Sequence, residues 1–141
     1  MNIGGQNAIK ILLTLLTLVI VLHLLIVIKV IPYKSAWGGR LETDEQMYMF
    51  EAISIIFNLL LSFILLIKGR FLQLPVRERL LNVILWIFLV LFSLNTIGNL
   101  FAQTNLEKLF AFVTFVFAFL IWVVIRSKVI DHQLFSPDSK R

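Results

Sequence analysis

The chain has 141 residues, of which 60% are hydrophobic and 15% are charged, and it contains no cysteine. Soluble proteins carry about a quarter charged residues, and a core of this size could not bury so much apolar surface. The sequence therefore predicts an integral membrane protein, without disulfides or thiol chemistry. The net charge of +5 does not indicate a nucleic-acid partner, because the basic residues gather at the edges of the hydrophobic stretches.

Four hydrophobic stretches are long enough to span a bilayer at about 1.5 Å per residue. We expect helices over about 10–31, 44–67, 80–102 and 106–126. The first apolar run is longer than that of a signal peptide, and no small-residue cleavage motif precedes Pro32, which is expected to end the helix. Thr43 and Gln46 form a capping box that predicts where the second helix begins.

These elements predict an all-α fold, an integral membrane four-helix bundle with an antiparallel up-down arrangement. We expect a single transmembrane domain over residues 1–130, with an outer loop at 32–43, a basic inner loop at 68–79 and a flexible cytoplasmic tail at 131–141. The expected location is the plasma membrane, which is the inner membrane of a bacterial cell, with the lipid bilayer as the surrounding partner.

The orientation follows from the lysine and arginine residues. With four spans, nine of the 13 lysines and arginines fall on the side of the termini, and four (Lys29, Lys34, Arg40 and Lys108) fall on the other. Because loops rich in lysine and arginine stay in the cytoplasm, both termini are predicted to be cytoplasmic.

Polar residues within the spans indicate where a functional site could lie. At 100° per residue, Tyr48, Asn58 and Ser62 fall within about 60° of Glu51 on the second helix. Counting about 1.5 Å per residue from the outer helix ends places His23, Glu51, Asn95 and Asn99 at a similar depth in the outer leaflet. An ionisable residue at such a depth is a hypothesis for function by default.

We therefore predict an outward-facing polar pocket centred on Glu51. Its walls would be His23, Asn95 and Asn99, its floor Asn58, and its rim the aromatic residues Trp37 and Tyr48 together with Arg40. The expected ligand is small and amphipathic or cationic, with Glu51 as its charge partner and an aromatic ring able to cover the cation. No catalytic residue, metal site or cofactor is predicted.

Other functions fit the same residues. One is a small transporter, including a proton-coupled one, although no internal repeat supports it. Another is a membrane enzyme in which Glu51 and His23 perform acid–base chemistry on a lipid-like substrate, although no nucleophile motif is present. A third is a partner in a homo-oligomer or a larger membrane complex, which the wide apolar helix faces would permit.

A purely structural explanation also exists for each polar residue. His23 and Glu51 could form a buried bond that fixes the register of two helices. Asn95, Asn99 and Ser62 could bond between helices, and Trp37 and Tyr48 could be ordinary interfacial anchors.

Overall fold

The computed structural model of the chain describes residues 3–37, 41–101 and 105–127. Within them the structure is all-α, and its four long helices are each long and apolar enough to cross a membrane. These are α1 (Ile3–Val27), α3 (Asp44–Lys68), α4 (Glu78–Leu100) and α5 (Asn105–Arg126). The prediction of an all-α fold with four helices able to span a membrane is confirmed, and these helices are consistent with a small multi-pass membrane protein. The tail at 131–141 and Arg40 lie outside the described residues.

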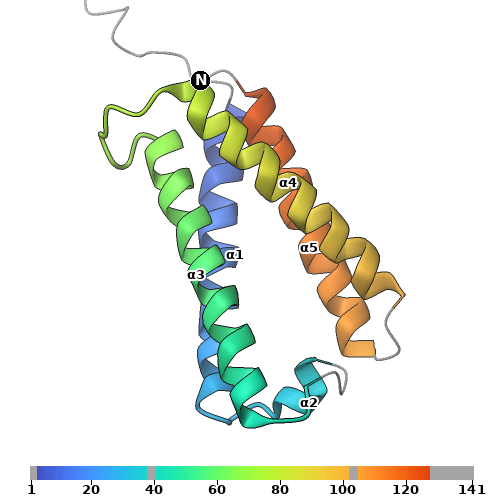
Figure 1. Cartoon of the computed structure of the whole chain (residues 1–141). Coiled ribbons are helices and arrows are strands. Elements are labelled where there is room, and N and C mark those ends of the chain that lie inside the picture. The colour runs from blue at the N-terminus through green and yellow to red at the C-terminus, as the bar shows by residue number, and fades with distance from the viewer. Residues whose placement is uncertain (1–2, 38–40, 102–104, 128–141) are drawn as a thin grey trace, which may run out of the picture.

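The long helices associate as two pairs. Figure 1 shows α1 beside α3 and α4 beside α5, with the two pairs meeting near the start of α1 and diverging toward the opposite end. At the meeting end, the Gln6 side chain donates a hydrogen bond to the carbonyl of Gly69, and Gly5 lies against Ser127. The start of α1 therefore lies beside the ends of α3 and α5. We call this the connector end, after the connecting segment 69–77, and we call the opposite end the loop end.

The apolar core follows the same division. A large cluster of buried side chains from all four long helices fills the connector half and includes Leu12, Leu65, Leu85 and Phe117. A small cluster at the loop end joins Ile26, Leu41 and Met47, with Trp37 packed against it. The aromatic residues of α5 divide in the same way, since Phe117 is buried whereas Phe112, Phe115 and Phe119 are exposed, as suits lipid contact.

Helix α1 ends earlier than the sequence suggests, because one residue after it has a left-handed backbone conformation. Lys29 has φ of 60°, so the amides of Val30 and Ile31 turn back to the carbonyl of Leu25. The same turn ends α3, where Arg70 has φ of 58° and the amides of Phe71 and Leu72 reach Leu66. This conformation costs a residue other than glycine about 1–2 kcal/mol. Two basic residues thus occupy positions that favour glycine.

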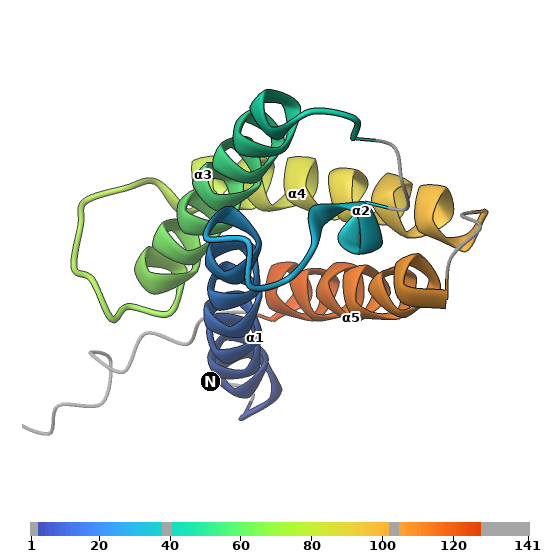
Figure 2. The same ribbon diagram turned by 90° about the horizontal axis from the view of Figure 1, so that it is seen from below.

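The loop between α1 and α3 contains a short helix that the sequence did not suggest, α2 (Tyr33–Ala36). Figure 2 shows α2 between the loop ends of the two helix pairs. Beyond the loop, the Thr43 hydroxyl accepts a hydrogen bond from the amide of Gln46, which confirms the predicted cap of α3. The Gln46 side chain accepts from the amide of Glu42, one residue before the cap. The loop is therefore fastened directly to the start of α3.

Candidate functional site

Helices α1 and α3 face each other along matching stripes whose residues alternate at spacings of three and four. On α1 the buried or half-buried stripe contains Ile9, Leu12, Leu16, Val19, His23 and Ile26. On α3 it contains Met47, Glu51, Ser54, Asn58, Leu61, Leu65 and Lys68. This spacing is that of a coiled-coil seam. Between Met47 and Leu61 the α3 stripe consists of the polar residues Glu51, Ser54 and Asn58. These three residues therefore lie between the two apolar clusters of the core.

Glu51 is the centre of this polar section. Its side chain is 0% exposed, and its Oε2 lies 2.5 Å from Nδ1 of His23 on α1. A carboxyl group in such a position would be costly if it lacked a partner. The hydrogen bond to His23 supplies that partner and links α1 to α3. The two residues that were expected at one depth are thus in direct contact.

The second oxygen of Glu51 is bound by the loop. The indole Nε1–H of Trp37, which directly follows α2, donates a hydrogen bond of 2.7 Å to Oε1. The Trp37 ring also packs against Phe50, with ring centroids 5.4 Å apart. Trp37 therefore covers Glu51 from the loop end, and three separate segments of the chain meet at one carboxyl group.

A second polar contact lies at the loop end of the same two helices. Lys29 donates a hydrogen bond of 2.5 Å to Asp44, and its ammonium lies 5.8 Å from the centre of the Tyr48 ring. The hydrogen bond to Asp44 is the main reason that the pKa of Lys29 is raised above its ordinary value. The Tyr48 side chain is exposed and lies close to Lys29, whereas the sequence suggested a place at the rim of a pocket around Glu51.

Asn58 and Ser62 bond within their own helix. The Asn58 amide donates to the carbonyl of Ser54, and the Ser62 hydroxyl donates to the carbonyl of Asn58. Asn58 is nevertheless buried and lies two helical turns from Glu51 on the same stripe, in the direction of the connector end. Its role as the floor of a pocket stays a prediction.

The asparagines of α4 do not join the cluster. Asn95 is exposed and Asn99 is half-buried, and neither forms a hydrogen bond with Glu51 within the described part of the chain. The inward position belongs instead to Thr96, whose hydroxyl donates a hydrogen bond of 2.9 Å to Thr114 on α5. Neighbouring residues of a helix point about 100° apart, so the orientation of α4 about its axis decides whether Asn95 or Thr96 faces inward. The structure therefore does not bring the two expected asparagines to Glu51, and a threonine pair joins α4 to α5.

Two buried charged residues escaped the sequence argument. Lys68 was counted among the basic residues of the connector, yet its side chain is 2% exposed and bound to Glu78 on α4. Glu107 in the first turn of α5 is also buried. Lys68 continues the stripe of Glu51 at the same spacing, and this signal could have revealed its burial.

The chemistry available at Glu51 is that of binding and proton sharing. Within the described residues no group of three or more histidines or acids could hold a metal ion. Comparisons with protein-family models, with curated proteins and with solved structures find no match for this chain. A proposal about function therefore rests on the geometry of the site.

Proposed function

We propose that this membrane protein binds a small amphipathic cation at Glu51, from the side of the loop 32–43. The observation that carries the proposal is the arrangement at Glu51, a fully buried carboxyl group whose second oxygen is held by the indole N–H of Trp37. A ligand ammonium offers the same kind of donor and adds the Coulomb attraction of its full positive charge for the carboxylate. Such a ligand would take the place of Trp37 on Oε1.

The surroundings of Glu51 suit an amphipathic cation. The apolar side chains of Ile26, Leu41 and Met47 lie together at the same end, and the rings of Trp37 and Phe50 offer faces that attract a cation. His23 holds the other carboxyl oxygen and so keeps the group oriented while Trp37 moves aside. Trp37 can move because it follows a helix of only four residues.

The proposed placement in the membrane sets the direction of access. Nine lysines and arginines on one side against four on the other support an antiparallel up-down bundle in the plasma membrane with both termini in the cytoplasm. The loop end would then face outward, and the ligand would reach Glu51 from outside.

Binding of a labelled amine tests this function. We expect a dansyl-labelled primary alkylamine to bind the protein in nanodiscs with a rise in fluorescence, and its N-acetylated form to bind poorly. Glu51→Gln keeps the shape and an acceptor for Trp37 but loses the charge. We expect it to weaken amine binding at least about thirtyfold, the low end of the cost of breaking a buried charged pair.

The matched control is Glu45→Gln, which removes an exposed acid from the first turn of the same helix. This variant should bind the amine as the wild-type protein does. If Glu51→Gln bound the amine as tightly as the wild type, or if the acetylated probe bound equally well, Glu51 would not be the charge partner.

A further inference from the structure

A pocket lies under the connecting segment 69–77, at the other end of α3 from Glu51. Its volume is about 470 Å³, which falls within the range of about 300–1,000 Å³ that is typical of small-molecule sites. Lys68 and Glu78 line it and are joined by a hydrogen bond of 2.7 Å, so their charges compensate each other. Six of its ten lining residues are apolar: Ile67, Leu72, Leu74, Pro75, Val76 and Leu81. Most of the lining therefore suits a hydrocarbon.

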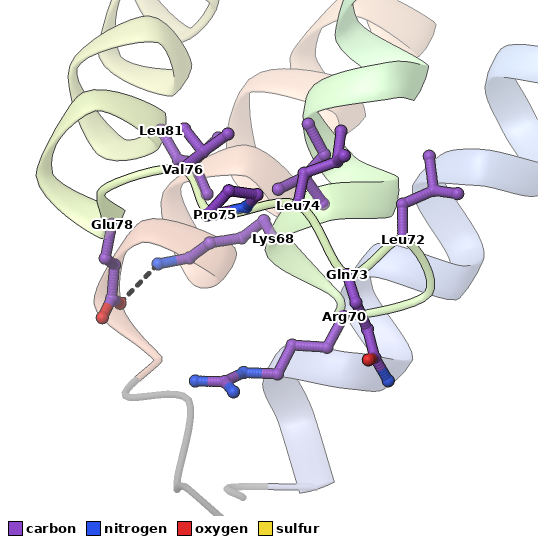
Figure 3. A pocket seen from close by; sticks show the side chains of 10 residues that line it. Lys68, Arg70, Leu72, Gln73, Leu74, Pro75, Val76, Glu78 and Leu81 are labelled. Atoms are coloured by element: carbon purple, nitrogen blue, oxygen red, sulfur yellow. Dashed lines mark hydrogen bonds and ion pairs between the residues drawn. The ribbon is translucent and has the colours of Figure 1, made fainter.

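The connecting segment has an apolar side and a polar side. Figure 3 shows the side chains of Leu72 and Leu74 extending toward the bodies of the helices, whereas the side chain of Gln73 points the other way. Side chains alternate in this manner along an extended chain. Leu72 and Leu74 both line the pocket, yet both also remain exposed on the surface of the protein. The segment therefore presents apolar surface on the side of the helix bodies.

The segment lies at the level where the spans end. The candidate spans of α3 and α4 end at Lys68 and begin at Glu78, and the segment joins them. Figures 1 and 2 show it projecting sideways from the bundle instead of continuing along the helix axes. A loop that projected along the axes would stand in water. A loop that projects sideways at this level meets the headgroups of the surrounding lipids, and side chains that turn toward the helix bodies reach the acyl chains.

The backbone limits how deep the segment can lie. In hydrocarbon each peptide group must find a hydrogen-bond partner. Within the described part of the chain, the amides of Gln73, Leu74 and Arg77 donate no backbone hydrogen bond. Water and headgroups at the membrane surface can accept from these amides. The backbone is therefore suited to the interface, and only the apolar side chains are suited to the acyl region.

The residues that follow the segment also suit the interface. Arg77 and Arg79 stand at the start of α4, and both side chains are exposed. A long arginine side chain near the end of a membrane helix can lay its hydrocarbon part along apolar surface and extend its charge to the headgroups. The leucines and the arginines thus favour the same depth for the connector end.

We propose that the connecting segment 69–77 is an interfacial anchor, with its backbone among the lipid headgroups and Leu72 and Leu74 in the acyl region. The partner of this surface is the lipid bilayer, and the pocket beneath the segment opens to acyl chains instead of water. The inference does not depend on amine binding at Glu51.

The depth of single spin labels tests the proposal. Because the chain has no cysteine, Leu72→Cys and Leu74→Cys each give the full-length protein one site for a nitroxide label. The labelled proteins are placed in phosphatidylcholine vesicles, and collisions with oxygen and with a water-soluble nickel chelate are measured by electron paramagnetic resonance. The ratio of the two collision rates gives the depth of the label.

The matched control is Gln73→Cys, whose side chain is exposed like those of its neighbours but lies on the polar side. Because the protein itself leaves all three positions exposed, a difference in depth must come from the bilayer. We expect the labels at 72 and 74 to lie at least about 5 Å deeper than the label at 73, the low end of the depth to which interfacial segments bury their apolar side. Equal depths at the three positions, or labels at 72 and 74 that collide mainly with the nickel chelate, would overturn the proposal.

Discussion

Replacing Glu51 by alanine is expected to destabilise the protein by about 2–3 kcal/mol. The change removes the hydrogen bonds to both His23 and Trp37 and leaves a void at a fully buried position. Hydrogen bonds between membrane helices average about 0.6 kcal/mol and reach about 1.7 kcal/mol, and the void adds a packing term. Glu51→Gln, which fills the space and keeps both kinds of bond, should cost less than about 1 kcal/mol.

Reversible unfolding by SDS in mixed micelles measures this difference. A double-mutant cycle that combines Glu51→Ala with His23→Ala separates the energy of the hydrogen bond from the cost of the void. The coupling energy contains only the interaction between the two side chains. We expect a coupling of at least about 0.6 kcal/mol. A coupling near zero would show that His23 and Glu51 do not support each other in the membrane.

Glu78→Ala is expected to destabilise the protein more than Lys68→Met, although the two changes break the same ion pair. The Glu78 side chain is 61% exposed and the Lys68 side chain only 2%. Removing Glu78 leaves the ammonium buried with Asn82 as its bonded partner, at a cost of about 1–2 kcal/mol. Methionine at position 68 fills a similar volume with an apolar chain, and Glu78 is left in water, so that change should be close to neutral.

The same unfolding measurement decides this comparison, and the double variant should resemble Lys68→Met alone. If Lys68→Met lowered the free energy of unfolding more than Glu78→Ala, the buried ammonium would contribute net stability to the fold. The expected cost of leaving it buried without Glu78 would then be wrong.

The sequence was sufficient to predict the four helices and to place His23 and Glu51 at one depth, with a bond between them as one of the open explanations. Hydropathy defines each span, and both residues lie on seams that repeat every three and four positions, so counting from the helix ends brings them to one depth. The cap at Thr43 could likewise be recognised from local chemistry, because a hydroxyl before the helix satisfies a free amide wherever the helix packs.

The remaining parts of the site depend on packing that a single sequence does not encode locally. Asn95 and Thr96 are neighbours, and either could face inward; only the threonine finds a partner, Thr114, on α5. Trp37 could have been an interfacial anchor, and its bond to Glu51 requires the unforeseen helix α2. Lys68 looked like a solvated basic residue, because its partners Glu78 and Asn82 lie beyond a connecting segment.

Trp37 covers Glu51, and we propose that a cationic ligand takes its place. Trp37→Phe keeps an aromatic ring next to Phe50 but removes the N–H that competes for Oε1. The most direct measurement is the affinity of this variant for the dansyl-labelled alkylamine in nanodiscs, relative to the wild type. We expect binding about tenfold tighter, because the ligand no longer displaces a hydrogen bond to a charged group. Unchanged or weaker binding would show that the ligand does not displace Trp37 from Glu51.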